Sequence, residues 1–270
     1  MARAEHLRLL PAVMALVTAL SIWAGGGAGA TEVEEDPLGY VVDPAALDDP
    51  EVIERGEELF RSGCVSCHGV GGVGGRNGPS VVDAGAASAH FYLTTGRMPA
   101  SLSGQAQPER KPPAYPPDQI EALVAYVASL GDGLPLPHVD LAHADLAEGG
   151  ELYRLDCAAC HSASGSGGAL SYGRNAPTLA EATPVQVAEA IRIGPGQMPG
   201  FTPESLTDQE VDDIVRYVQF LQDGEDPGGL SLGRVGPIPE GFVAILIGLG
   251  ATLLAAFWIG KRRLETKDAE

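Results

Sequence analysis

The chain has 270 residues, with 17 Lys and Arg against 36 Asp and Glu, which gives a formal net charge of −19. Such an acidic chain repels a phosphate backbone, so we expect no nucleic-acid partner. A hydrophobic fraction of 44% is too high for a disordered protein, and the length suits one or two domains. With 36 Gly, 21 Pro and only 6% aromatic residues, the sequence predicts small cores and long loops.

The N-terminal segment, residues 1–30, has the order of a signal peptide. Arg3 and Arg8 precede an apolar run over residues 9–24, and small residues then lead to an acidic stretch. An uncleaved membrane anchor is the alternative, although the run is short and interrupted by Pro and Gly. Residues 31–50 are expected to form an acidic lead-in to the folded body.

An internal repeat organises the body of the chain. A shift of 93 residues superposes Gly56, Leu59, Phe60, Cys64, Cys67 and His68 on Gly149, Leu152, Tyr153, Cys157, Cys160 and His161. Further on, Met98-Pro99 matches Met198-Pro199. We therefore predict two tandem domains, residues 51–131 and 146–223, joined by a linker over residues 132–145.

Each copy predicts an opening helix, the cysteine motif, a long loop, Met-Pro and a closing helix. The opening helices are expected over residues 51–60 and 146–155. The closing helices have apolar stripes at helical spacing, formed by Ile120, Leu123, Val124 and Val127 in the first copy and by Val211, Ile214, Val215 and Val218 in the second. Thr207 and Glu210 predict a capping box for the second closing helix. Because no alternating strand pattern is present, the predicted class is all-α.

All four cysteines lie in two Cys-x-x-Cys-His motifs, which comprise Cys64, Cys67, His68, Cys157, Cys160 and His161. This motif is typical of c-type haem attachment. One helical turn lets both thiols form thioethers with the porphyrin edge, and the following imidazole reaches the iron. A zinc site shared by four cysteines and a redox-active dithiol are the alternatives, but neither uses the repeated His. The sequence thus predicts two covalently bound haem c groups.

Met98 and Met198 are the candidate sixth ligands of the two irons. The other two methionines, Met1 and Met14, fall in the predicted signal peptide. Each candidate follows its motif His, by 30 and 37 residues, and each precedes a Pro. Core packing is the alternative role. A His/Met pair saturates the iron and raises its potential, which suits electron transfer.

Other residues are assigned less specifically. Pro79 and Pro177 lie between His and Met, where a carbonyl can accept a hydrogen bond from the ring N–H of the motif His; an ordinary loop Pro is the alternative. Arg97 and Arg174 can pair with haem propionates or lie solvated at the surface. The unmatched histidines are expected in loops or at the surface: His90, His138 and His143.

The C-terminal part predicts a membrane anchor. Residues 242–259 carry no charge over 18 positions, so we predict a transmembrane helix over residues 242–260. The preceding residues 224–241 are rich in Gly and Pro and predict a tether. The tail, residues 261–270, begins with three basic residues and is expected in the cytoplasm, which leaves the haem domains on the extracytoplasmic side of the cell membrane.

Several segments carry a resemblance to a known family: Thr95-Gly96-Arg97-Met98-Pro99-Ala100, Gly104-Gln105-Ala106-Gln107 with Arg110-Lys111, Gly167-Gly168-Ala169-Leu170 and residues 237–241. Through them, residues 48–263 resemble the di-haem cytochrome c subunit of the actinobacterial menaquinol:cytochrome c reductase, the cytochrome bcc complex. The resemblance implies two class I cytochrome c folds outside the membrane. It also implies that electrons come from the Rieske iron-sulfur subunit, beside the cytochrome b subunit, and pass to a haem-copper terminal oxidase. The chain would then be the electron-transfer subunit of a translocase, without other catalytic chemistry.

Two other functions stay open at this point. The di-haem subunit of a cbb-type oxidase also has two c-type domains, but there the anchor precedes them, whereas the predicted anchor here follows them. A di-haem peroxidase needs one iron without a permanent sixth ligand, and the matched methionines disfavour it.

Overall fold

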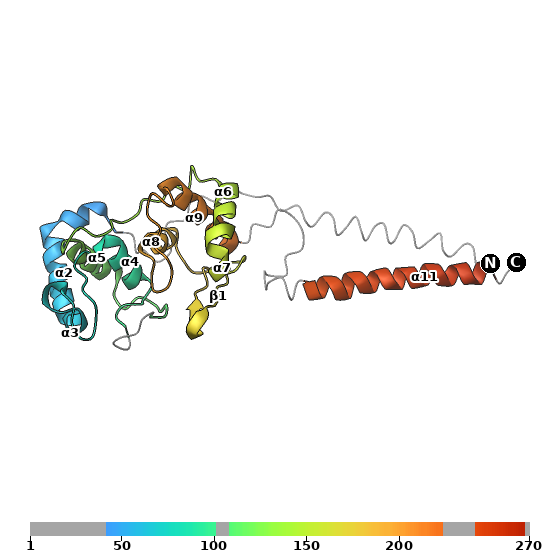
Figure 1. Ribbon diagram of the computed structural model, residues 1–270, viewed down its shortest axis with the longest axis horizontal. Coiled ribbons are helices and arrows are strands. Elements are labelled where there is room, and N and C mark those ends of the chain that lie inside the picture. The colour runs from blue at the N-terminus through green and yellow to red at the C-terminus, as the bar shows by residue number, and fades with distance from the viewer. Residues whose placement is uncertain (1–41, 101–107, 224–240, 268–270) are drawn as a thin grey trace. The chain divides into compact units, whose positions relative to one another are not determined.

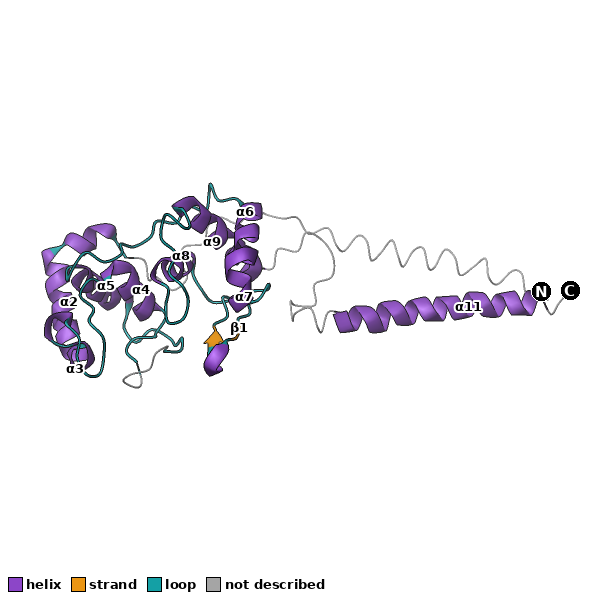
Figure 2. Cartoon of the chain, in the orientation of Figure 1, coloured by secondary structure: helices purple, strands orange, loops and turns teal. Residues whose placement is uncertain are grey.

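The computed structural model describes residues 42–100, 108–223 and 241–267. The predicted signal peptide, most of the acidic lead-in and the tether up to residue 240 lie outside the described residues. Within the described residues, the chain is mainly helical (Figures 1 and 2), and its strands are limited to one antiparallel pairing of two residues each. The predicted all-α class, with one candidate transmembrane helix near the C-terminus, is therefore confirmed.

The first haem-motif domain is built around two crossing helices. Its elements are η1 (Pro44–Asp48), α2 (Pro50–Gly63), α3 (Val65–His68), η2 (Val70–Gly72), α4 (Gly85–Thr94) and α5 (Pro117–Ala128). The N-cap of α2 is Asp49, whose carboxylate accepts a hydrogen bond from the Glu51 amide at 2.8 Å. The apolar stripe predicted for the closing helix is buried, because α5 packs against both α2 and α4.

The second domain repeats this arrangement with different local details. Its elements are α6 (Leu146–Leu152), a π-helical turn η3 (Tyr153–Cys157), α7 (Ala158–His161), β1 (Gly168–Ala169), η4 (Ser171–Gly173), β2 (Asn175–Ala176), α8 (Pro184–Ile193) and α9 (Asp208–Asp223). The predicted capping box of α9 is confirmed, because the Thr207 amide donates to Glu210 at 2.7 Å and the Glu210 amide donates to Thr207 at 3.3 Å. The opening and closing helices, α6 and α9, pack against each other.

The matched glycines of the repeat lie at equivalent helix crossings. A Cβ atom on Gly56 would come 1.9 Å from the Ala122 carbonyl oxygen of α5, and one on Gly149 would come 1.8 Å from the Asp213 carbonyl oxygen of α9. Neither contact is possible for any residue with a side chain. The glycines therefore let each opening helix touch the backbone of its closing helix, which explains why both copies keep them.

Aromatic residues complete the same crossings: Phe60 and Tyr153 are matched in the repeat, and Tyr126-Val127 of the first closing helix corresponds to Tyr217-Val218 of the second. The ring centroids of Phe60 and Tyr126 are 5.2 Å apart in the first domain, and those of Tyr153 and Tyr217 are 5.3 Å apart in the second. Phe60 and Tyr153 are both buried in the cores of their domains. Tilted aromatic pairs at this separation add to the stabilisation that comes from burial alone. Each small core thus has an aromatic pair that links its opening and closing helices.

The long loops expected between His and Met contain two further helices, which corrects the sequence prediction. Helix α4 in the first copy and α8 in the second each cover ten residues. They pack against each other and join the two domains (Figure 1). Seven of the ten residues of α4 are buried, so it has no polar face and therefore no amphipathic stripe to reveal it.

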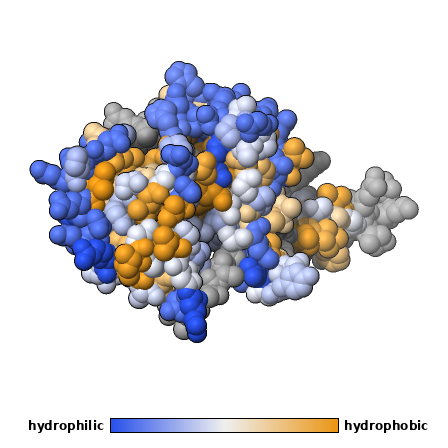
Figure 3. Space-filling view, turned by 60° about the vertical axis from the view of Figure 1, so that its left-hand side comes forward, coloured by the Kyte–Doolittle hydropathy of each residue, from blue (hydrophilic) through white to orange (hydrophobic). Residues whose placement is uncertain are grey.

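The C-terminal segment forms one helical run with a π-helical stretch, η5 (Ala244–Leu249), followed by α11 (Gly250–Lys267). Its part Gly241–Gly260 is long and apolar enough to cross a membrane, and none of the residues tested there is buried. The helix extends beyond residue 260, where the sequence predicted its end. Figure 3 shows apolar residues along this segment and, on the visible face of the haem-motif domains, apolar residues gathered within a hydrophilic surround.

Candidate functional site

Each cysteine motif forms a helical turn that extends the opening helix of its domain. The Cys64 amide donates to the Phe60 carbonyl at 2.8 Å, and the His68 amide donates to the Cys64 carbonyl at 2.9 Å. In the second domain, α7 forms the equivalent turn after η3. Each turn carries two thiols and one imidazole to the lining of a single pocket. All four cysteines are free of disulfide bonds.

The imidazole of each motif is oriented by a proline carbonyl. His68 Nδ1 lies 2.8 Å from the Pro79 carbonyl oxygen, and His161 Nδ1 lies 3.1 Å from that of Pro177. A carbonyl only accepts, so Nδ1 carries the proton and the lone pair of a neutral ring is at Nε2. Burial lowers the pKa of His161, with the Pro177 hydrogen bond opposing it. Both predicted proline contacts are confirmed, and they hold the imidazoles in the form that binds a metal.

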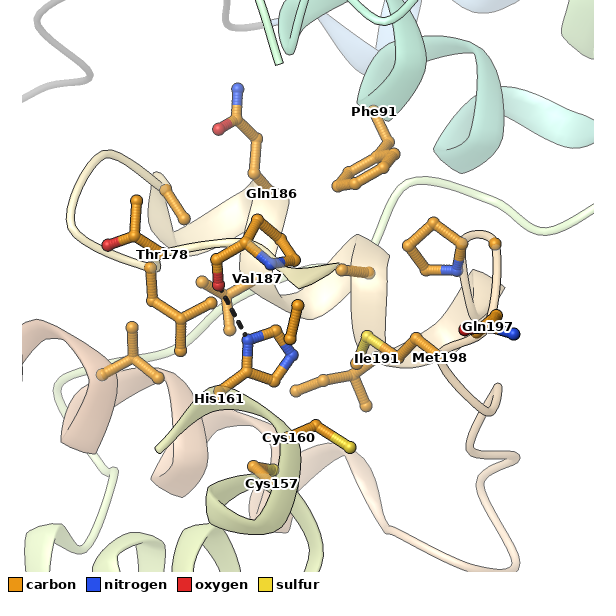
Figure 4. A pocket seen from close by; sticks show the side chains of 18 of the residues that line it. Phe91, Cys157, Cys160, His161, Thr178, Gln186, Val187, Ile191, Gln197 and Met198 are labelled. Carbon is orange, nitrogen blue, oxygen red and sulfur yellow. Dashed lines mark hydrogen bonds between the residues drawn. The ribbon is translucent and has the colours of Figure 1, made fainter. Parts of the chain in front are cut away.

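A methionine lies in the same pocket as each cysteine motif. Met98 lines the first pocket together with Cys64, Cys67 and His68. Met198 lines the second, and Figure 4 shows its thioether and the ring of His161 directed into one space, with both cysteines of that motif on the adjacent turn. The structure thus brings all eight predicted site residues together as two sets of four.

The thiols do not have the properties of the two alternative sites. Burial, with a smaller effect from Cys67, raises the pKa of Cys64 to about 11. Burial, followed by Asp156 and Cys160, raises the pKa of Cys157 to about 12. A redox-active dithiol needs a lowered thiol pKa, so these environments disfavour it. The cysteine pairs also line separate pockets, so they form no shared four-cysteine zinc site.

The pocket of the second domain has one wall from the first domain, which the repeat did not predict. Its lining includes Phe91, Tyr92 and Arg97 from α4 and the residues after it, and Pro108 and Arg110 further along. In Figure 4 Phe91 extends from α4 toward the pocket. No described residue of the second domain lines the first pocket. The two sites therefore have matching ligand sets in different surroundings.

Polar contacts between α4 and α8 fix this wall. His90 Nδ1 lies 2.7 Å from Glu189 Oε1, and both side chains are buried. Gln186 donates from Nε2 to Thr94 Oγ1 at 3.1 Å and accepts at Oε1 from Arg110 Nη1 at 3.1 Å. Sequence reasoning missed these residues, because each acquires its partner from the other domain.

Three expectations for individual residues have different outcomes. His90 is 4% exposed, so the prediction that it lies in a loop or at the surface is wrong; it is a buried residue of α4. Its expected surface companions, His138 and His143, are exposed. Arg97 is buried and lines the second pocket, whereas Arg174 is partly exposed and is not among the residues found to line either pocket.

Comparison with protein families defines the class of both domains. Residues 53–131 match the model described as cytochrome c, and residues 144–218 match that of cytochrome C oxidase, cbb3-type, subunit III. The body of this chain is thus a pair of cytochrome c domains. Among curated proteins, the cbb3-type cytochrome c oxidase subunit FixP of Sinorhizobium medicae is 27% identical over 188 residues, or 64% of this chain and 62% of the relative.

Other relatives are more similar over more of the chain. The cytochrome bc1 complex cytochrome c subunit of Mycobacterium tuberculosis (strain ATCC 25618 / H37Rv) is 41% identical over 220 residues, which cover 78% of each chain. That of Corynebacterium diphtheriae is 34% identical over 279 residues, which cover 97% of each chain. The chain therefore belongs to the family of cytochrome bc1 complex cytochrome c subunits, electron-transfer components of an oxidoreductase complex in the respiratory chain.

The two pockets fit the c-type haems that cytochrome c domains carry. Each has two thiols one helical turn apart, an imidazole with its Nδ1 hydrogen-bonded to a carbonyl, and a thioether. These are the donor types of a covalently attached haem with nitrogen and sulfur axial ligands. The buried Arg97 Nη1, to which no described residue offers an acceptor, adds a cation for an acidic group in the second pocket. The chain thus has two covalently bound haem c groups as its cofactors.

Proposed function

We propose that each domain holds its haem through the four residues that line its pocket. Cys64 and Cys67 attach the first haem, and His68 and Met98 are its axial ligands. The equivalent residues of the second haem are Cys157, Cys160, His161 and Met198. The observation that carries this proposal is the repeated meeting of two thiols, one oriented imidazole and one thioether in a single pocket.

In this arrangement the residues of the protein would hold each haem and fill the ligand positions of its iron. They would take no part in making or breaking the bonds of a substrate. The haem provides a one-electron couple. The proline carbonyls orient the imidazoles, and the methionines occupy the positions that oxygen or peroxide would need. Such sites exchange electrons without binding a substrate, which fits an electron-transfer subunit and disfavours a peroxidase.

We further propose the partners and the direction of electron flow. Electrons enter from the Rieske iron-sulfur subunit beside cytochrome b and leave to a haem-copper terminal oxidase, so the chain is the electron-transfer subunit of a translocase. The support is the membership of the family, together with the acidic charge of the chain, which favours partners with basic surfaces.

The proposed layout places the haem domains outside the cell membrane. The helix Gly241–Gly260 spans the membrane once, and the basic residues that follow it stay in the cytoplasm. For the remaining segments we propose the bounds expected from the sequence: signal peptide 1–30, lead-in 31–50, haem domains 51–131 and 146–223 with linker 132–145, tether 224–241, membrane-spanning part 242–260 of the longer C-terminal helix, and tail 261–270.

The ligand proposal is tested by carbon monoxide difference spectra of the reduced protein. The wild type should show no carbon monoxide adduct, because both irons are saturated. Met98→Ala and Met198→Ala should each open one iron, bind carbon monoxide and lower the potential of that haem. If both variants kept the wild-type spectrum and potentials, the methionine assignment would be wrong.

Purification of the native complex in mild detergent tests the proposed partners. If both the cytochrome b and the Rieske subunits were absent from the purified complex, the proposed partners would be contradicted.

A further inference from the structure

Arg97 is a residue of the first domain whose side chain serves the pocket of the second. It follows α4, lines the pocket that contains His161 and Met198, and is only 8% exposed. No described residue accepts a hydrogen bond from its Nη1 atom. Burying a cationic donor without an acceptor is unfavourable, because the group loses its hydrogen bonds to water and gains none from the protein. The guanidinium is therefore suited to bind an anionic group inside this pocket.

A second guanidinium, that of Arg110, supports the binding of an anion in this pocket. Arg110 lines the same pocket, held by hydrogen bonds from Nη1 to Gln186 Oε1 at 3.1 Å and from Nη2 to the Glu181 carbonyl at 2.6 Å. Burial lowers the pKa of Arg97, and Arg110 lowers it further, so the two cations repel each other. Asp156, the only acidic residue among those described that line the pocket, is exposed, and the Glu181 carboxylate, 3.6 Å from Arg110 Nε, has a side chain that is 76% exposed. An anion bound beside both guanidinium groups would relieve this repulsion.

The backbone prevents Arg97 from sharing the pocket of its neighbour Met98. Gly96 has φ of +60°, and a Cβ atom there would come 2.1 Å from the Lys111 carbonyl oxygen, so this corner requires glycine. The Met98 amide then donates to the Tyr92 carbonyl at 2.9 Å. Fixed in this way, consecutive residues diverge: Met98 lines the first pocket and Arg97 lines the second.

We propose that Arg97 is a positioning residue for the second haem, whose propionate carboxylates its guanidinium binds across the domain interface. The proposal rests on the proposed function in one respect, namely that the second haem occupies the pocket with His161 and Met198. A guanidinium presents paired N–H donors that match a carboxylate, and the thioether bonds leave the propionates of a haem available. The residue before one haem's proposed iron ligand thus supplies the charge for the other haem.

The test measures the midpoint potentials of both haems in the full-length protein in mild detergent. Met198→His identifies the second haem in the titration, because replacing a Met ligand by His lowers the midpoint potential of that haem well below that of the first haem. In this background Arg97→Gln should lower the second potential, since removing a nearby positive charge favours the oxidised iron. We expect a change of roughly tenfold in the reduction equilibrium, or about 59 mV for one electron. Arg97→Lys should restore most of the difference, because the charge returns.

Two further measurements separate a charge effect from a structural one. Arg174→Gln is the matched control, an arginine of the second domain that is not found to line either pocket, and it should leave both potentials unchanged. In Arg97→Gln, the second potential should also vary more steeply between about pH 5 and pH 8, because a propionate without the guanidinium takes up a proton more readily. Protein that folds and keeps both haems but shows no shift, or a shift of the first potential alone, would overturn the proposal. If Met198→His changed the midpoint potential of neither haem, the ligand assignment would be contradicted instead.

Discussion

The buried pair of His90 and Glu189, which joins the two domains, should make the stability of the protein depend on pH. Burial raises the pKa of Glu189 from its ordinary 4.5 to about 7, with the hydrogen bond to His90 opposing part of this rise. At a pH between 4.5 and about 7, Glu189 keeps its proton in the folded protein, whereas the same carboxyl group releases it in the unfolded chain. The folded state is thus favoured at low pH, and this advantage is lost as the pH rises through 7.

The size of the effect follows from the shift. At about 1.4 kcal/mol per pKa unit, a rise from 4.5 to about 7 corresponds to about 3 kcal/mol between the two limits. Glu189→Gln removes this contribution, because an amide stays neutral and its oxygen still accepts a hydrogen bond from His90. The variant should therefore gain stability relative to the wild type as the pH rises. For a body of this size the relative midpoint of thermal unfolding should increase by roughly 6–12 °C.

Calorimetry of the haem-loaded protein at pH 5 and pH 9 provides the measurement. The matched control is Glu181→Gln, which removes another acidic residue at the domain interface, one whose side chain is 76% exposed and lies 3.6 Å from Arg110. Its effect should stay below about 1 kcal/mol at both pH values. If the difference between Glu189→Gln and the wild type were the same at pH 5 and pH 9, the buried carboxylate would not be the source of the pH dependence.

Two further predictions concern haem attachment and helix packing. Replacing Cys157 and Cys160 together by Ala should leave a weaker but visible band in a haem stain after denaturing electrophoresis, because the first haem stays covalently bound; a band unchanged in intensity would contradict attachment at this motif. Gly149→Ala should lower the free energy of unfolding, measured by chemical denaturation, by at least about 1–3 kcal/mol, because its Cβ would meet the Asp213 carbonyl. The control is Glu151→Ala, on the exposed side of the same helix, which should change this free energy by less than about 0.5 kcal/mol. Equal effects of these two substitutions would refute the packing argument.

The sequence predicted the parts of the site that depend on short-range spacing. A Cys-x-x-Cys-His turn places its own side chains on one side, whatever surrounds it, so the motif residues could be assigned directly. Met98 and Met198 could be assigned because no other methionine lay outside the predicted signal peptide. The carbonyl contacts of Pro79 and Pro177 could be expected because the repeat kept them between His and Met.

The parts that were missed depend on contacts between distant segments. Helix α4 is buried on most sides, so its sequence lacks the polar face that marks a helix at the surface of a domain. His90 was expected in a loop or at the surface because its partner Glu189 lies 99 residues further along the chain. The wall that the first domain gives to the second pocket has no counterpart in the repeat, so comparing the two copies could not predict it.

This wall makes the two haem sites physically unlike, although their ligand sets match. The second pocket is lined on one side by Phe91 and Tyr92 from the neighbouring domain, together with the buried Arg97 and the partly exposed Arg110. Haem potentials depend on burial and nearby charge as well as on axial ligands. The domain interface therefore distinguishes two sites that the repeat would make equivalent, and we expect the two haems to differ in midpoint potential for this reason.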